Sequence, residues 1–214
     1  MTRTRTTTTF AEAAWISAIC FGWAILASSE SVAAGFQDLA FTDASLIGLV
    51  AMELVLGAIA MLVLHARGYA LSGLYPSPSM AGVGWGLGLY VACLGASWIA
   101  VAPFAGSQPS QPIDAMVSGA SVSLPPVVAA ALVNGAYEEV FLLGFLLRGL
   151  RGYGLSVALG VSLLIRVLYH LYQGPLGAVS VLAFGLVLSL YYIRTSSLFP
   201  VVFAHVLADI VPFV

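Results

Sequence analysis

The chain consists almost entirely of apolar runs of about 20 residues, the length an α-helix needs to cross the hydrocarbon layer of a membrane. Short stretches rich in Gly, Pro, Ser or Arg separate the runs and predict turns. The runs are Ala11–Ala34, Ala44–Leu64, Met80–Phe104, Val122–Leu147, Leu155–Tyr172, Leu176–Ile193 and Leu198–Val214. The sequence therefore predicts an all-α fold, a polytopic transmembrane helix bundle of about seven spans, with no soluble domain.

The composition excludes the main soluble classes of protein. Charged residues make up 7% and hydrophobic residues 61% of the 214 residues. A soluble domain carries roughly 25% charged residues, so this chain lacks the charge to cover a water-facing surface. It has no lysine and only seven arginines, which argues against a nucleic-acid partner. Its two cysteines, Cys20 and Cys93, lie inside apolar runs and indicate no disulfide framework.

The arginines predict how the chain is oriented. If the chain crosses the membrane seven times, six of the seven arginines fall on one side: Arg3, Arg5, Arg67, Arg148, Arg151 and Arg194. The alternate loops hold Asp38, Asp43 and Asp114 but no arginine. Because cytoplasmic loops carry an excess of arginine and lysine, we expect the N-terminus in the cytoplasm and the C-terminus outside.

A second constraint is the set of ionisable side chains inside the last four runs. Each costs at least about 2.5–3.5 kcal/mol at the centre of a membrane, so each is a functional candidate. They are Glu138, Glu139, Arg166, His170, His205 and Asp209. None is stable as a charge facing lipid, so we expect them to converge inside the bundle. Asn134 lies one helical turn before Glu138 and is most simply a helix–helix hydrogen-bond partner.

Such a cluster suits hydrolysis by two routes. A carboxylate and an imidazole at one water molecule can take its proton, and a second imidazole can stabilise the oxyanion that follows attack on a carbonyl. Alternatively, a carboxylate and two imidazoles can bind a metal ion with an open position for water. The residues alone leave both routes open.

These residues also resemble a known family. Glu138-Glu139 followed by Gly144, then Tyr169-His170-Leu171-Tyr172-Gln173-Gly174, then His205-x-x-x-Asp209 resemble the CPBP family of intramembrane proteases. That family, also called ABI, includes the CAAX prenyl endopeptidases and bacteriocin-processing or self-immunity proteins of bacteria. The resemblance covers about Val122 to Asp209, which suggests a catalytic core at 122–214 and an N-terminal part at 1–121 that matches only as apolar spans.

The resemblance implies a role for each site residue. Glu138 would be the general base that activates water, assisted by His170, and Glu139 would orient that pair. His205 and Asp209 would stabilise the oxyanion, or His205 would complete a metal site. Zinc and a metal-independent glutamate mechanism are equally compatible with the family. The implied partner is a peptide or lipidated-protein substrate within the lipid bilayer, cleaved near the cytoplasmic half, and the motif variant favours a bacterial plasma membrane.

Two positions depart from the family pattern. Leu143 stands where the Glu-Glu-x-x-x-Arg motif has its arginine, and Arg166 stands where the Phe-x-x-x-His motif has its phenylalanine. An arginine at position 143 would lie one turn from Glu139 and could pair with it. Our hypothesis is that Arg166 neutralises Glu139 from the neighbouring helix instead. On this hypothesis Arg166→Leu cripples the protein and Leu143→Arg is tolerated.

Two other functions stay open at this point. The cluster is also consistent with a catalytically degenerate member that serves as an immunity or interaction scaffold. A small proton or cation transporter would use intramembrane ionisable residues too, although no inverted repeat is visible. Glu53 lies in the middle of the second run with no obvious partner and is a candidate for the same polar interior. Glu12, Glu30 and His65 lie near the ends of runs and are most simply solvated.

One geometric difficulty concerns His170. At 1.5 Å per residue, Glu138 lies about 15 Å from Arg148, whereas His170 lies about 24 Å from Gly154 on a straight helix. The two residues meet only if the fifth run is tilted, bent or enters the membrane late.

Overall fold

The computed structural model describes residues 5–36, 40–104, 106 and 111–214. These residues form α1 (Phe10–Ala33), α2 (Asp43–Ala66), α3 (Met80–Val101), α4 (Pro112–Ser118), α5 (Leu124–Glu139), α6 (Leu155–Tyr169), α7 (Pro175–Thr195) and α8 (Phe199–Ile210). A π-helical segment, Val140–Leu147, continues α5. Short 3-10 helices lie at Leu71–Leu74, Ala102–Phe104, Leu150–Tyr153, Leu171–Gln173 and Val211–Phe213. The described part of the chain has no β-strand, only two isolated bridges, so the predicted all-α class is confirmed.

Within the described residues, five helical segments are long and apolar enough to cross a membrane, and they coincide with five of the predicted runs. They are Phe10–Ala33, Asp43–Ala66, Met80–Phe104, Leu124–Leu147 and Pro175–Thr195. The other two predicted runs form shorter apolar helices, Leu155–Tyr169 and Phe199–Phe213. These helices identify the chain as an integral membrane protein. That it crosses the membrane seven times stays a prediction.

Helix α4 is an element that the sequence does not predict, because the prolines around it indicate a turn. Pro112 occupies the first turn of α4, where its missing N–H group is not needed. The backbone N–H of Gln111 donates to Asp114 Oδ2 at 3.2 Å, which closes the start of the helix. Residues 107–110, where the sequence predicts a turn, lie outside the described residues, as do Arg3 and Asp38 of the orientation argument.

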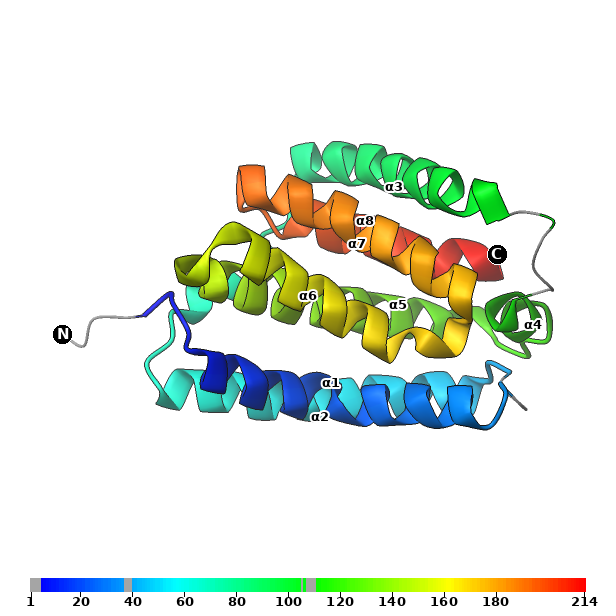
Figure 1. Cartoon of the computed structure of the whole chain (residues 1–214), viewed down its shortest axis with the longest axis horizontal. Helices are drawn as coiled ribbons and strands as arrows, with labels where there is room; N and C mark the ends of the chain where they lie inside the picture. The colour runs from blue at the N-terminus through cyan, green and yellow to red at the C-terminus, as the bar shows by residue number, and fades with distance from the viewer. Residues whose placement is uncertain (1–4, 37–39, 105, 107–110) are drawn as a thin grey trace.

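The long helices lie side by side in layers along the long axis of the molecule (Figure 1). Helices α1 and α2 form one outer layer, α5 and α6 lie in the middle, and α7, α8 and α3 lie on the other side. Helix α5 packs against both α2 and α8. Within the most apolar stretch of Leu124–Leu147, which is α5 with its π-helical continuation, 78% of the residues are buried, against 11–28% in the other four long helices. The helix that carries the adjacent glutamates is therefore the core of the bundle.

The arginine-rich end of the bundle is held by polar contacts. Glu12, in the first turn of α1, accepts from Arg5 Nη2 at 2.6 Å and from Arg67 Nε at 2.9 Å. Arg151 Nη2 donates to the carbonyl of Ile193 at 3.2 Å, which ties the α5–α6 connection to the end of α7. The side chain of Glu12 is only 11% exposed and forms two ion pairs. The expectation that Glu12 is simply solvated is therefore wrong.

At the opposite end of the bundle, Asp43 at the start of α2 holds the start of α5. Its two carboxylate oxygens accept from the backbone N–H and the hydroxyl of Ser123, each at 2.7 Å. Helix α4 lies at this end too (Figure 1). Arg5, Arg67 and Arg151 therefore lie at one end of the bundle, and Asp43 and α4 lie at the other.

Candidate active site

Glu138 and Glu139 are the last two α-helical residues of α5 before the helix widens. The segment Val140–Leu147 that follows is π-helical, a rare geometry that is frequent at functional sites. Both side chains are buried, with 3% exposure for Glu138 and 0% for Glu139. Two adjacent carboxylates inside an apolar bundle require compensating donors, and the neighbouring helices supply them.

Arg166 of α6 supplies the positive charge. Its Nη2 donates to both oxygens of Glu139, at 2.8 and 2.9 Å, and its Nη1 lies 3.4 Å from Glu138 Oε2. The guanidinium is 1% exposed. The expected pairing of Arg166 with Glu139 is therefore present. Position 143, where the family motif has its arginine, holds a leucine with 0% exposure inside the main apolar cluster.

His205 of α8 joins the same network. Its Nδ1 lies 2.6 Å from Glu139 Oε1. Its Nε2 lies 3.8 Å from Glu138 Oε2 and 3.7 Å from Asp209 Oδ1, one turn further along α8. A carboxylate at Nδ1 fixes the orientation of an imidazole and leaves Nε2 for chemistry. Glu139 thus holds both Arg166 and His205, and Nε2 of His205 lies between Glu138 and Asp209.

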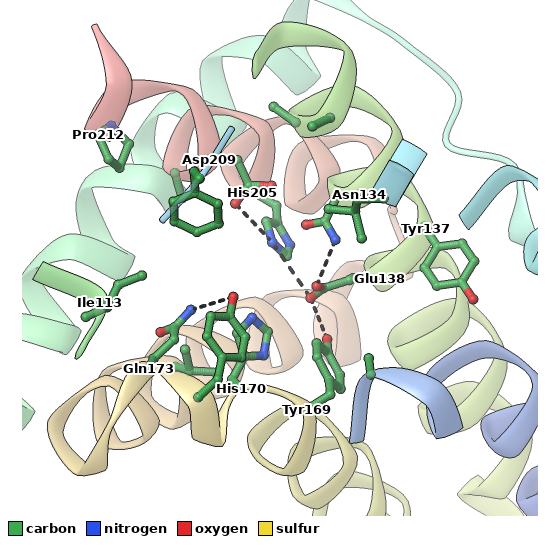
Figure 2. Close-up of a pocket in the computed structure, with 18 of the residues that line it drawn as sticks. Ile113, Asn134, Tyr137, Glu138, Tyr169, His170, Gln173, His205, Asp209 and Pro212 are labelled. Atoms are coloured by element: carbon green, nitrogen blue, oxygen red, sulfur yellow. Dashed lines mark hydrogen bonds and ion pairs between the residues drawn. The ribbon is translucent and has the colours of Figure 1, made fainter. Parts of the chain in front are cut away.

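The two oxygens of Glu138 have different surroundings (Figure 2). Oε2 accepts a short hydrogen bond from the hydroxyl of Tyr169, in addition to its contacts with Arg166 and His205. Among the described residues, Oε1 accepts a hydrogen bond only from Asn134 Nδ2, at 3.1 Å. Oε1 is therefore the oxygen with capacity left for a further partner.

Tyr169 and Glu53 are two polar residues at this site whose contacts the sequence did not reveal. The ring of Tyr169 stacks on Phe21 of α1, with centroids 5.0 Å apart, and its hydroxyl binds Glu138. Glu53 of α2 is 4% exposed and accepts from Asn134 Nδ2 at 2.8 Å. Glu53 thus faces the polar interior, as its mid-span position suggested.

His170 reaches the site because α6 is short. The α-helix ends at Tyr169, and His170 is its C-cap residue. Since Tyr169 binds Glu138, the end of α6 lies at the level of Glu138, and the depth difficulty noted above disappears. His170 Nδ1 lies 2.9 Å from the carbonyl of Arg166. This contact leaves Nε2 as the nitrogen available to another group.

A cavity of about 730 Å³ lies beside Glu138. Five of the six predicted site residues line it: Glu138, Arg166, His170, His205 and Asp209. Glu139 does not. Helices α5, α6 and α8 supply these polar residues, and most of the remaining lining is apolar. The cavity extends past Asp209 to Ile113 and Met116 of α4 and to Pro212, away from the arginine-rich end (Figure 2).

A metal ion at this cluster would need free ligand atoms. Glu138, Glu139 and His205 each offer one, and these atoms lie within 4.8 Å of one another. Both oxygens of Glu139 are already bound by Arg166, however, and its Oε1 also contacts His205. A guanidinium against both carboxylates opposes a dication by charge, since arginine stays protonated. This set of three residues therefore does not fit a metal ion while Arg166 is in place.

Comparison with known proteins finds a similarity in the C-terminal helices. No curated protein and no solved structure shows significant similarity to the chain. One family model matches, over residues 120–211 of the 214. The matched region carries Glu138, Glu139, Arg166, His170, His205 and Asp209, whereas Glu53 lies outside it. Residues 120–211 thus match the family described as type II CAAX prenyl endopeptidase Rce1-like, which belongs to the family that the three motifs resemble.

Proposed function

We propose that the protein is an intramembrane endopeptidase in which Glu138 activates the attacking water. The observation that carries this role is the asymmetry of its carboxylate. Oε2 is held by Tyr169 and Arg166, whereas Oε1 keeps capacity for a water molecule beside a cavity of about 730 Å³. A general base needs this combination of a fixed position and a free lone pair.

The reaction follows from that placement. Glu138 takes a proton from water, and the hydroxide oxygen bonds to the carbonyl carbon of the peptide. The resulting oxyanion is stabilised by the imidazolium form of His205, which donates Nδ1–H to Glu139 and presents Nε2–H between Glu138 and Asp209. The C–N bond then breaks as Glu138 returns its proton to the leaving nitrogen. The products are one new carboxyl terminus and one new amino terminus.

His170 and Glu139 support this chemistry in different ways. His170 lines the cavity, and its Nδ1 contact with the Arg166 carbonyl leaves Nε2 free to accept a hydrogen bond from the attacking water. Glu139 lies outside the cavity lining and holds Arg166 and His205 in place. We therefore assign His170 to water activation and Glu139 to positioning.

The substrate that fits is a peptide with an apolar or lipid-bearing portion, because the cavity beyond the polar residues is lined mainly by apolar side chains. The family description names prenyl endopeptidases. A membrane-associated peptide or lipidated protein in a bacterial plasma membrane is the substrate setting that we propose.

The two alternative functions have less support. The main argument for a degenerate scaffold is the missing motif arginine, and Arg166 supplies a cation to Glu139 from another helix. Many transporters are built from inverted repeats, and none is visible in this sequence. Proton or cation flux in liposomes that depends on Glu138 would favour the transporter over the enzyme.

The test is cleavage of a library of quenched peptides, with and without a lipid chain, by the purified protein in detergent. Glu138→Gln keeps the shape of the side chain and removes the base, and Glu30→Gln is the matched control at an exposed position. We expect the wild type and Glu30→Gln to cleave and Glu138→Gln to lose at least about a hundredfold in rate. Chelator and added zinc are parallel arms, and neither should change the rate. Cleavage by Glu138→Gln at the wild-type rate would refute the assignment.

A further inference from the structure

Glu53 is a buried carboxylate in the middle of α2, whose other ionisable side chains, Asp43 and His65, lie near its ends. It lies on α2, outside residues 120–211 that match the family, and its side chain is 4% exposed. One of its oxygens, Oε2, is buried without a hydrogen-bond partner among the described residues. Burying such a group without full compensation costs stability. A carboxylate at this position therefore requires a reason other than packing.

The contact that Glu53 makes leads directly to Glu138. Asn134 Nδ2 donates one hydrogen to Glu53 Oε1 at 2.8 Å and the other to Glu138 Oε1 at 3.1 Å. Asn134 and Glu138 lie one turn apart on the same face of α5, and α2 packs against α5. One amide nitrogen thus connects the carboxylate of α2 to the carboxylate of α5, and both carboxylates line the same cavity.

This bridge fixes the catalytic oxygen of Glu138. Oε2 is held on the other side by Tyr169, Arg166 and His205. Asn134 is the hydrogen-bond donor to Oε1, so it occupies one lone pair of this oxygen and, with the donors to Oε2, fixes the plane of the carboxylate and the direction of the remaining lone pair. Without an acceptor at Glu53, the amide of Asn134 is free to rotate and its hydrogen bond to Glu138 loses its direction. A side chain amide has two donors, and the second must also be satisfied inside the bundle.

We propose that Glu53 is a positioning residue, which orients Asn134 and through it the basic oxygen of Glu138. This role rests on the proposed peptidase function. Glu53 acts as a hydrogen-bond acceptor and not through its charge. Its substitution therefore changes the catalytic step more than substrate binding, and a neutral acceptor replaces it.

The test compares Glu53→Leu, Glu53→Gln, Asn134→Leu and the double variant Glu53→Leu/Asn134→Leu in the full chain. Leucine removes the acceptor and keeps an apolar side chain of similar size, whereas glutamine keeps the oxygen. Thermal unfolding in detergent is measured on every preparation, and kcat and KM are measured with the best peptide from the library. Glu30→Leu, at an exposed position near the end of α1, is the matched control.

We expect Glu53→Leu to lower kcat by about 10- to 100-fold with KM little changed, since misplacement of a catalytic group costs this much. Glu53→Gln should restore most of kcat. The double variant should be no slower than Asn134→Leu alone, because residues that act as one unit are not additive.

Three results would overturn the role of Glu53. The first is a wild-type kcat in Glu53→Leu, and the second is a folded but inactive Glu53→Gln. The third is a double variant whose fold-loss in kcat equals the product of the fold-losses of Glu53→Leu and Asn134→Leu. Each of them is read beside Glu138→Gln. If Glu138→Gln is inactive and Glu53→Leu is fully active, only the role of Glu53 fails. If Glu138→Gln cleaves at the wild-type rate, the role of Glu138 as the base fails, and if the folded wild type cleaves no peptide, the peptidase function itself fails.

Discussion

Arg166 binds both carboxylate oxygens of Glu139 through one guanidinium nitrogen, at 2.8 and 2.9 Å, in the interior of the bundle. The two side chains come from adjacent helices and expose 1% and 0% of their surface. The same guanidinium also lies 3.4 Å from Glu138. One cation thus stabilises the two neighbouring carboxylates, and Glu139 also contacts His205.

The first prediction concerns the loss of that cation. Arg166→Leu leaves Glu139 buried with only His205 beside it, and removal of one partner of a buried ion pair costs about 3–5 kcal/mol in the free energy of unfolding. We expect Arg166→Leu to unfold earlier in a thermal or SDS titration and to lack peptidase activity. Arg166→Leu/Glu139→Leu, which leaves no unpaired charge at this pair, should regain much of the lost stability but not the activity.

The control for this prediction is Arg194→Leu, which removes an exposed arginine at the end of α7. It should unfold like the wild type, because exposed charges contribute little to stability. Wild-type unfolding of Arg166→Leu would show that the buried pair is not needed for the fold.

The second prediction corrects an expectation drawn from the family motif. Leu143→Arg looks tolerable in the sequence, because an arginine at that position would lie one turn from Glu139. Leu143 is fully buried in the main apolar cluster, however, and Glu139 already has its cation. We therefore expect Leu143→Arg to lower stability, as an unpaired buried charge does. In the Arg166→Leu background it should not restore activity. Rescue of Arg166→Leu by Leu143→Arg would show instead that position 143 can reach Glu139.

The sequence predicts the helices well and the site in part, for identifiable reasons. The apolar runs determine the long helices because membrane thickness sets their length. Glu138, Arg166 and His205 stand out because a charge in an apolar run is costly and must have a partner. The pairing of Arg166 with Glu139 follows from the leucine at the motif position.

Other features carry no such signal. The π-helical turn after Glu139 lies in a run of Val, Phe and Leu that is equally compatible with an α-helix. Tyr169 is uncharged, so nothing in the sequence marks its hydroxyl as a donor to Glu138. Asn134 is expected as a helix–helix hydrogen-bond partner, but its contact with Glu138 depends on the packing. The partner of Glu53 lies on another helix, 81 residues away, and its identity depends on the packing of α2 against α5.

The third prediction tests the donor to Oε2 of Glu138. Tyr169→Phe removes the hydroxyl that binds Glu138 and keeps the ring that stacks on Phe21. We expect kcat to fall about tenfold or more, because one oxygen of the base is less firmly held. Stability should change by only about 1 kcal/mol, the typical net contribution of one hydrogen bond. Tyr75→Phe at an exposed position is the control. An unchanged kcat would show that Arg166 and His205 suffice to hold Glu138.

The fourth prediction concerns the side of the membrane from which substrate enters. Cleavage near the cytoplasmic half is the expectation from the sequence. The cavity, however, extends from Glu138 toward α4 and Pro212, whereas Arg5, Arg67 and Arg151 lie at the other end. If the arginine-rich end is cytoplasmic, as the positive-inside rule predicts, the cavity extends toward the outer face. Substrate would then approach from outside the cytoplasm.

Two serines make this orientation measurable by thiol labelling. Ser118 is exposed on α4, near the cavity, and Ser156 is exposed at the start of α6, near the arginine-rich end. The natural Cys20 and Cys93 are buried and provide a low background. In intact cells, a membrane-impermeant maleimide should label Ser118→Cys and should label Ser156→Cys only after permeabilisation. The reverse pattern would place the cavity on the cytoplasmic side and make this chain an exception to the positive-inside rule, because its arginine-rich end would then face outward.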